Sequence, residues 1–319
     1  MDYPLVAIVT PTYNGAAFLD EAMQSVQAQT YPNLVHVVLD NASTDGTDEI
    51  IARYQGGRVP VLAFRNASLL PQRANWNTAF SHVPGDAAYV RLLCDDDTIY
   101  PDGVEKMVAL AEQDPEIGIV GCLHWCDGGI TEFHWPEDQS VYDGHEAIRR
   151  HLLGEGRLMP IHLLMRKSVV DRRTPLFDDF LVGGFDVDTT IALLRETKFG
   201  FVHECLAFTR VHENTVSNLT TKANNARTRD AFDLLRRYGP EVFGDQHPGL
   251  EARFRRYYAR RILKWRRAGM AAEHLAIHFD ALKQAQAPFG PRLLGEAALD
   301  WVLIQLGLRQ RWTGYPGWQ

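Results

Sequence analysis

Short apolar runs alternate with amphipathic stretches along the first 121 residues of the chain. The runs show little apolar–polar alternation, which is typical of strands buried on both faces. Strands are predicted at residues 5–10, 34–39, 59–64, 88–93 and 117–121, with helices between them at 16–28, 45–54, 73–80 and 101–114. This order predicts an α/β fold in which a mostly parallel sheet is flanked by helices on both faces.

Three of the predicted strands end in polar, turn-prone residues. These segments are TPTYN at 10–14, DNAS at 40–43 and CDDD at 94–97. Ligands of parallel sheets bind outside the carboxyl ends of the strands. The pattern therefore predicts that the three segments meet at one crevice.

The pattern is less regular after Gly121, in a stretch rich in Gly, Trp, His and Pro. The elements predicted beyond it are a helix at 143–153, a strand at 162–166, a helix at 185–195, a strand at 199–203 and helical segments from about 221 to 308. We place a boundary near residue 220. This gives an α/β domain at 1–220, with halves at 1–121 and 122–220, and a C-terminal helical region at 221–319.

Composition narrows the class of protein. The chain has 319 residues, 45% of them hydrophobic and 23% charged, and a net charge of −7, so we expect a globular protein without a nucleic-acid partner. The N-terminus lacks the basic leader of a secretory signal, and no run approaches the roughly 18 apolar residues of a membrane span. The four cysteines lack zinc-site spacing. We expect free thiols and a cytoplasmic protein.

The acidic triplet Asp95, Asp96 and Asp97 follows an apolar strand directly. Three adjacent carboxylates repel one another unless a cation lies among them, and carboxylate oxygens suit Mg²⁺ or Mn²⁺. A divalent ion there can neutralise the diphosphate of a substrate. The alternative is a solvated acidic turn. In the two earlier segments, Tyr13 can stack on a flat base and Asn14 can hydrogen-bond it, while Asp40 and Asn41 are placed to bind a pyrimidine edge. The alternative is that those residues only form strand-to-helix turns and bind no ligand.

The ordered set of these three motifs, with Pro101 after the third, resembles the nucleotide-binding half of family 2 glycosyltransferases. The resemblance is strong over residues 5–121, patchier to about 218 and absent beyond. It implies an inverting enzyme of the Rossmann-like GT-A fold, with residues 1–121 binding the nucleotide sugar and 122–220 binding the acceptor. It assigns binding of the nucleoside base to Pro11, Tyr13, Asn14 and Asp40. It also implies that the acidic motif binds the diphosphate and a Mn²⁺ or Mg²⁺ cofactor. Asp96 is then the main metal ligand, supported by Asp95 and Asp97, and Cys94 is assigned to packing.

The resemblance extends to later motifs. It places Arg73 and Asn77 at the nucleotide sugar, whereas a buried Trp76 on a plain helix surface is the alternative. It makes Asp186 the catalytic base, with Asp188 as a second acidic position. Both aspartates could instead complement the dipole of a helix. The Arg-x-His motif ending at His212 implies a metal or diphosphate contact, and we expect a closing lid at 214–218.

The acceptor is expected at Trp125 and Trp135, since sugar rings stack on indole; core packing of one tryptophan is the alternative. A basic, aromatic helix at 253–267 could lie on an anionic membrane or pack on the protein. The function expected is transfer of a sugar from a nucleotide-diphosphate sugar, UDP by default, to a glycan or lipid-linked acceptor in surface-polysaccharide synthesis. The enzyme would work in the cytoplasm or at the inner membrane face. An inactive glycan-binding or scaffolding protein and a sugar nucleotidyltransferase are the rival interpretations.

Overall fold

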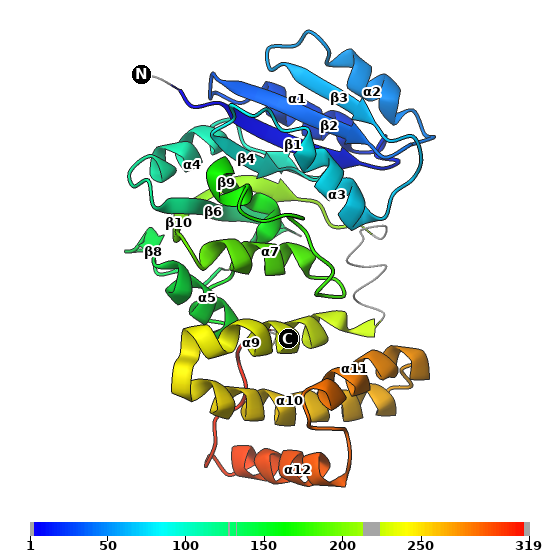
Figure 1. The fold of residues 1–319 in the computed structure, drawn as a ribbon, viewed down its shortest axis with the longest axis vertical. Helices are drawn as coiled ribbons and strands as arrows, with labels where there is room; N and C mark the ends of the chain where they lie inside the picture. The colour runs from blue at the N-terminus through cyan, green and yellow to red at the C-terminus, as the bar shows by residue number, and fades with distance from the viewer. Residues whose placement is uncertain (1–2, 127, 132, 213–223, 316–319) are drawn as a thin grey trace. The chain divides into compact units, whose positions relative to one another are not determined.

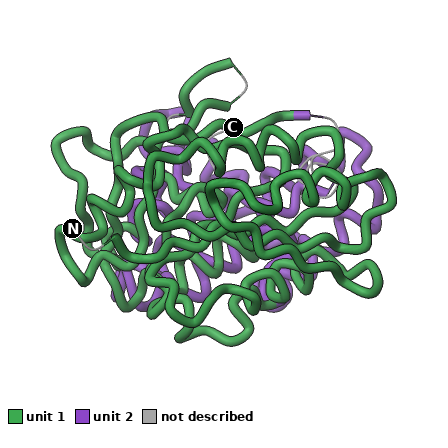
Figure 2. The backbone as a smooth tube through the Cα atoms, turned by 90° about the horizontal axis from the view of Figure 1, so that it is seen from above, with its two compact units in different colours: residues 1–147, 157–178, 185–211 green, residues 148–156, 179–184, 212–319 purple. Residues whose placement is uncertain are grey.

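The structure is a computed structural model of the chain, and it describes residues 3–126, 128–131, 133–212 and 224–315. The chain divides into two compact units, which Figure 2 draws in different colours. Unit 1 contains Met1–Ala147, Arg157–Asp178 and Phe185–Val211, and unit 2 contains Ile148–Gly156, Asp179–Gly184 and His212–Gln319. Because unit 2 takes in two short segments of the earlier chain, the single boundary near residue 220 stays a prediction.

Within the described ranges, ten strands of unit 1 form one sheet in the order β3-β2-β1-β4-β9-β6-β10-β5, with β7 on β6 and β8 on β10 (Figure 1). Strands β1 to β4 are parallel, and β9 pairs antiparallel with both β4 and β6, so β6 and β10 run in the same direction as β1. This confirms the α/β fold with a mostly parallel sheet. The strands are β1 Val6–Thr12, β2 Leu34–Asp40, β3 Val61–Arg65, β4 Tyr89–Leu92, β5 Thr98–Ile99, β6 Ile117–Cys126, β7 Gly129–Ile130, β8 Val141–Tyr142, β9 Leu164–Arg166 and β10 Lys198–Thr209.

Helices cover both faces of this sheet (Figure 1). Alternate residues of β1 point to opposite faces, so Val6 and Ile8 pack in the cluster that contains α1 and α4, whereas Val9 packs with Ala79 of α3. The helices up to the end of the sheet are α1 Leu19–Gln27, α2 Thr47–Arg53, α3 Gln72–Ser81, α4 Gly103–Ala111, α5 Gly144–Leu153, the 3₁₀ turn η1 Pro160–His162, α6 Lys167–Val170 and α7 Phe185–Leu194.

Several strands are longer than the sequence pattern predicts, among them β10, which spans Lys198–Thr209 where a strand was predicted at 199–203. The first strand was predicted to end at residue 10, but β1 continues to Thr12, and Pro11 lies opposite Leu39 of β2. Strand β4 pairs with β1 only as far as Val9, so no ladder on that side requires a backbone N–H from the proline. Strand β6 continues to Cys126 because the long β10 pairs with it as far as Thr209.

Unit 2 consists mainly of helices, as predicted for the C-terminal region. The helices are α9 Ala226–Phe243, the 3₁₀ turn η3 Gly244–Gln246, α10 His247–Arg267, α11 Ala272–Gln284 and α12 Pro291–Gln305. The aromatic side chains of the basic helix α10, including Phe254, Tyr258 and Trp265, are buried. Burial of these side chains corresponds to the second of the two roles considered for this helix, packing on the protein. Across the described chain, no helix combines the length and hydropathy needed to cross a bilayer.

Candidate functional site

The acidic corner, defined here as Cys94, Asp95, Asp96 and Asp97, is the turn that follows β4. The Cys94 sulfur and one carboxylate oxygen each of Asp96 and Asp97 lie within 4.8 Å of one another. Asp97 is buried, and the other three residues are half-buried. The turn therefore presents two carboxylates and a sulfur to one point at the carboxyl edge of the sheet. The sequence interpretation assigned Cys94 to packing, whereas the structure places its sulfur with the carboxylates.

Neighbouring elements fix the shape of this corner. The Thr12 hydroxyl, at the end of β1, donates a hydrogen bond to Asp95. At the end of β10, the Arg210 backbone N–H donates to Asp97 Oδ1 at 2.9 Å, and its guanidinium Nε donates to the Asp96 carbonyl at 3.1 Å. The ends of β1 and β10 thus contact the acidic turn that follows β4, and the end of β10 was not among the segments predicted to meet there.

The electrostatics of the corner favour a cation. Burial raises the pKa of Asp95 to about 6, and the neighbouring Asp96 carboxylate adds to the effect. Burial and the same neighbour raise the pKa of Asp97 to about 8. Both shifts reflect the cost of holding adjacent negative charges away from water. A divalent cation would remove that cost, and the two carboxylates fit Mg²⁺ or Mn²⁺, which prefer oxygen ligands.

The two candidate base residues lie in the first turn of α7 in different environments. Asp186 is half-buried, and its Oδ1 accepts a hydrogen bond from the Val187 N–H at 2.8 Å. Its charge acts on Cys94 together with those of the acidic triplet, and with burial raises the pKa of that thiol, so Asp186 lies near the corner. Asp188 is fully buried and pairs with Arg173 at 2.6 Å. Asp186 is therefore the less buried of the two aspartates, and Asp188 takes part in a buried ion pair.

The two predicted base-binding turns are joined by hydrogen bonds. The Asn14 N–H donates to Ser43 Oγ at 2.8 Å, and Asn14 Oδ1 accepts from the Thr44 N–H at 3.0 Å. Asp40 is buried, is paired with Arg65, and accepts from the Ser43 N–H at 2.9 Å. Tyr13 is 47% exposed, so its ring is accessible for stacking. Pro11 is buried inside β1 and contributes through the strand that carries Tyr13.

Three predicted ligand residues make hydrogen bonds within the fold, and their ligand contacts stay predictions. The Asn41 amide accepts from the Leu70 N–H and donates to the Leu70 carbonyl, both at 2.9 Å. The Asn77 amide accepts from the Phe177 N–H at 3.0 Å and donates to the Phe177 carbonyl at 2.8 Å. Trp135 is buried, and its indole N–H donates to the Arg157 carbonyl at 2.9 Å. All three side chains are occupied in holding the fold.

The other predicted residues keep their candidate roles. Arg73 lies with its guanidinium carbon 5.4 Å from the ring centre of Phe185, which directly precedes Asp186. Trp125, near the end of β6, is 38% exposed and accessible to an acceptor. His212 is half-buried and begins the C-terminal segment of unit 2, and its role as a metal ligand stays a prediction. The predicted lid at 214–218 lies outside the described residues.

Sequence reasoning missed several residues that support the site. It named the Arg-x-His motif but considered only the histidine, whereas Arg210 makes two hydrogen bonds to the acidic corner. It also missed Thr12 and Arg65, which contact Asp95 and Asp40. His162, from the η1 turn, lies with Nε2 3.9 Å from Asp97 Oδ2 and 2.6 Å from Thr209 Oγ1. Arg210 and Thr12 lie in motifs that the sequence showed, whereas Arg65 and His162 do not.

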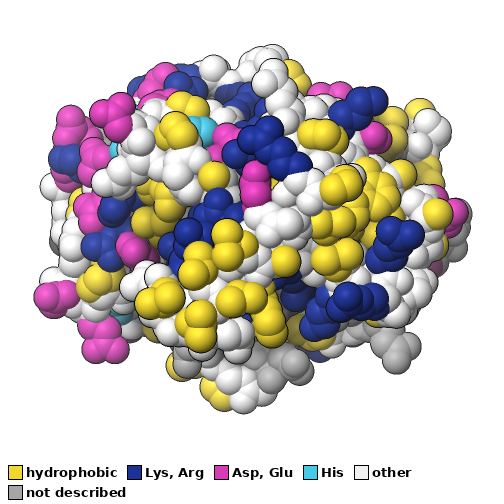
Figure 3. All heavy atoms as spheres, turned by 90° about the horizontal axis from the view of Figure 1, so that it is seen from below, with side chains coloured by type: hydrophobic (Ala, Val, Ile, Leu, Met, Phe, Trp, Pro, Cys, Tyr) yellow, Lys and Arg dark blue, Asp and Glu magenta, His cyan; other side chains and the backbone are white. Residues whose placement is uncertain are grey.

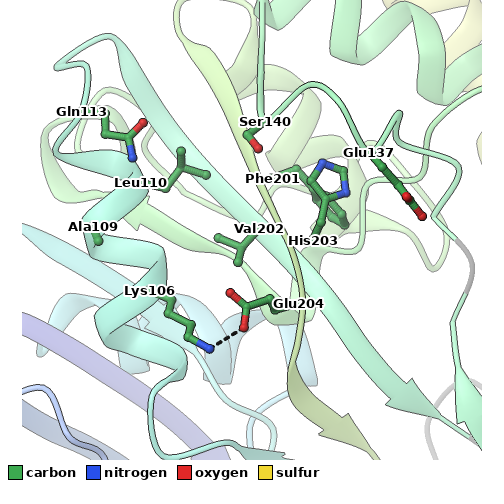
Figure 4. A pocket seen from close by; sticks show the side chains of 10 residues that line it. All are labelled: Lys106, Ala109, Leu110, Gln113, Glu137, Ser140, Phe201, Val202, His203 and Glu204. Atoms are coloured by element: carbon green, nitrogen blue, oxygen red, sulfur yellow. Dashed lines mark hydrogen bonds and ion pairs between the residues drawn. The ribbon is translucent and has the colours of Figure 1, made fainter.

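A pocket of about 410 Å³ lies elsewhere in unit 1, between α4, β10 and the segment around Ser140 (Figure 4). Lys106 and Glu204 form an ion pair in its wall, and His203 accompanies them. None of the predicted site residues lines this pocket. It therefore adds nothing to the acidic corner.

Known proteins are similar to this chain in sequence. The sequence model described as glycosyl transferase family 2 matches residues 7–174, more than half of the chain. An uncharacterized glycosyltransferase of Rickettsia typhi is 28% identical over 218 residues, which cover 67% of this chain and 66% of that protein. The putative teichuronic acid biosynthesis glycosyltransferase TuaG of Bacillus subtilis is 26% identical, over 69% of this chain and 84% of its own.

Two solved structures share the fold. Residues 1–349 of S. aureus TarS in complex with UDP-GlcNAc align with a TM-score of 0.64 and 14% identity, over 87% of this chain and 79% of that one. The mannosyltransferase PcManGT of Pyrobaculum calidifontis, in complex with GDP-Man and Mn²⁺, aligns with a TM-score of 0.54 and 18% identity, over 97% and 82%. At these identities the likeness establishes the GT-A fold.

Proposed function

Because this chain belongs to glycosyl transferase family 2, we propose that it is an inverting transferase that uses a nucleoside-diphosphate sugar as donor. The observation that carries the proposal is the acidic corner together with Asp186 of α7. The charge of Asp186 contributes to the raised pKa of Cys94, so the two side chains lie near each other. A carboxylate pair able to hold a cation and a separate carboxylate able to take a proton are what a single-displacement transfer needs.

In the proposed reaction, the acceptor hydroxyl attacks the anomeric carbon of the donor sugar. The new carbon–oxygen bond forms as the bond to the diphosphate breaks, and Asp186 takes the hydroxyl proton. The nucleoside diphosphate leaves from the opposite face, so the anomeric configuration inverts. Asp96 and Asp97 would hold a Mn²⁺ or Mg²⁺ ion, which supplies positive charge to the leaving diphosphate.

The donor-binding residues follow from the two joined turns. Tyr13 stacks on the base, Asn14 and Asp40 orient it, and Arg73 contacts a phosphate through its fork of donors. UDP is the default nucleotide, and the TarS neighbour was solved in complex with UDP-GlcNAc. The acceptor is a glycan or a lipid-linked sugar that meets the exposed Trp125. The similarity to TuaG, a putative teichuronic acid biosynthesis glycosyltransferase, supports a step of surface-polysaccharide synthesis, which we place in the cytoplasm.

The pair Asp186→Asn and Asp188→Asn tests the catalytic assignment. We expect Asp186→Asn to lower kcat by about 10²–10⁴-fold, because proton transfer is lost, and to leave donor affinity unchanged. Asp188→Asn should instead lower the free energy of unfolding by about 1.5–3 kcal/mol, because it removes the charged hydrogen bond with Arg173 while Asp178 remains as a partner. Transfer from a panel of nucleotide sugars with Mn²⁺, and thermal melting, measure the two effects.

Asp86→Asn provides the matched control, since Asp86 is exposed and lies outside the site. It should change neither measurement. Full turnover by Asp186→Asn would contradict the base assignment. If the unaltered protein neither transfers nor hydrolyses any donor, with or without Mn²⁺, the inactive glycan-binding alternative would replace the transferase.

A further inference from the structure

Helix α12 of unit 2 has an unusual distribution of polar and apolar side chains. Its inner stripe, Leu293, Ala297 and Asp300, is buried at helical spacing and faces α10, the element α12 contacts most. Outside this stripe α12 exposes the large apolar residues Leu299, Trp301 and Val302, and Leu306 and Leu308 follow its end; the five side chains are 44–72% exposed. A helix of a globular protein normally has the opposite arrangement, with polar residues outside.

The buried polar group of this helix is fully compensated within unit 2. Asp300 Oδ1 accepts from Arg256 Nε at 2.9 Å and Arg309 at 2.7 Å, and Oδ2 accepts from Arg260 at 2.5 Å. These contacts anchor α12 on α10 through ion pairs. The outer apolar residues are therefore not needed to hold the helix in place. We call Leu299, Trp301, Val302, Leu306 and Leu308 the outer face of α12.

Positive charge borders this outer face. Arg292 lies at the first turn of α12, and Arg309 and Arg311 follow its C-terminal end. Between His247 and Tyr315 the sequence has twelve Lys and Arg residues and five Asp and Glu residues, although the chain as a whole has a net charge of −7. Seen from below, hydrophobic side chains gather on the surface next to Lys and Arg (Figure 3).

We propose that the outer face of α12 docks unit 2 on an anionic lipid surface, with α12 lying in the plane of the membrane. Leucine, valine and tryptophan side chains enter the boundary between headgroups and acyl chains, and the arginines at both ends meet lipid phosphates. This differs from the membrane contact expected from the sequence, which relied on α10. The aromatic side chains of α10 are buried in unit 2 and are not available to a membrane.

A second copy of the chain fits this surface less well. Arg309 and Arg311 follow the C-terminal end of α12, whereas Arg292 at the other end pairs with Glu296, so a parallel pair of such helices brings two basic ends together. Like charges in contact oppose association, whereas an anionic membrane neutralises both ends. The charge distribution therefore selects lipid over self-association.

Vesicle flotation with the full chain tests this proposal. We expect binding to mixed phosphatidylcholine–phosphatidylglycerol vesicles to exceed binding to phosphatidylcholine vesicles at least about tenfold, and to weaken as salt is raised. The double variant Trp301→Gln, Leu306→Gln should bind the anionic vesicles at least about tenfold more weakly, because it removes apolar area from the outer face. Both positions are exposed, so the fold should be kept.

The matched control is Leu69→Gln with Ile130→Gln, two comparably exposed apolar residues of unit 1, and it should bind vesicles like the unaltered protein. Equal binding of the unaltered protein and the Trp301, Leu306 variant would overturn the proposal. So would a dimer in sedimentation analysis that this variant dissociates, without vesicle binding, which would assign the face to a second copy. No donor is present in these measurements, so their outcome is independent of the transfer reaction.

Discussion

At the scale of single residues, the space around Gly15 limits what the acidic corner can tolerate. A Cβ atom at this position would lie 2.4 Å from Thr12 Oγ1 and 2.6 Å from Asp95 Oδ2. Both atoms belong to the hydrogen bond that joins the end of β1 to the acidic turn. Any side chain at Gly15 must therefore displace one of the groups that shape the corner.

Gly15→Ala tests this constraint. We expect the substitution to push Asp95 away from Thr12 and to weaken binding of a nucleoside diphosphate with Mn²⁺ at least about tenfold, since displacements near 1 Å at a site have large effects. Gly85→Ala is the control, because nothing lies within 4 Å of its added Cβ. Titration calorimetry with UDP and Mn²⁺ measures both. Unchanged affinity of Gly15→Ala would show that the corner does not depend on this contact.

The residue scale also shows where sequence reasoning about the site ends. The acidic triplet could be predicted because its charges follow an apolar strand, and topology places strand ends together. Asn41 and Asn77 have the same chemistry as ligand-binding amides, but their partners, Leu70 and Phe177, lie 29 and 100 residues away. Nothing local in the sequence reveals that these amides are already occupied.

At the scale of secondary-structure elements, helix α9 holds the loop that leads into α7. The Asp230 carboxylate accepts hydrogen bonds from the N–H groups of Val182, Gly183 and Gly184 at 2.9, 2.9 and 2.8 Å. The chain enters α7 directly after this loop, so the position of Asp186 depends on how the loop is fixed. Asp230 is thus a positioning residue for the proposed base.

We expect Asp230→Asn to lower kcat about tenfold with little change in donor affinity. The asparagine side chain has one acceptor oxygen where aspartate has two, and its NH₂ group would face N–H donors of the loop. Asp233→Asn is the control, because Asp233 is also buried on α9 but pairs with Arg229 instead of the loop. Steady-state kinetics and thermal melting separate the two variants. If both lower kcat equally, the effect comes from general destabilisation of α9 and not from the loop.

The element scale also explains which parts of the fold the sequence could predict. Long apolar runs such as those of β1 and β2 predict buried parallel strands, and these are confirmed. The reversed direction of β9 could not be predicted, because it depends on pairing with β4 and β6, which are distant in sequence. The two-residue strands β5, β7 and β8 are too short to leave a periodic pattern.

At the scale of the whole molecule, buried titratable groups act on stability in opposite directions. Burial lowers the pKa of His36 to about 3, and of His124 and His278 to about 4, so acid opposes folding at these sites. Burial raises the pKa of Asp95 and Asp97, so the folded state takes up protons there more readily than the unfolded chain. The pH dependence of stability is the sum of these terms, and a single histidine can be isolated only by difference.

His36 on β2 is a histidine whose contribution to the pH dependence can be isolated by comparison with a variant. It is fully buried, and its Nε2 lies 2.9 Å from Thr10 Oγ1 on β1. Its ordinary pKa of 6.5 falls to about 3 on folding, so between these pH values the unfolded state holds more protons. Stability contributed by the neutral imidazole is therefore complete above pH 6.5 and declines as the pH falls, by at most about 1.4 kcal/mol per pH unit.

We predict that acid reduces the unfolding free energy of the unaltered protein faster than that of His36→Gln, because glutamine does not titrate. Urea denaturation of both proteins at matched pH values measures the gap between them, and the carboxylate contributions cancel in that gap. The advantage of histidine should shrink by about 1 kcal/mol per unit below pH 6. A gap independent of pH would mean that His36 gains a proton as easily in the sheet as in the unfolded chain, which its burial between two paired strands opposes.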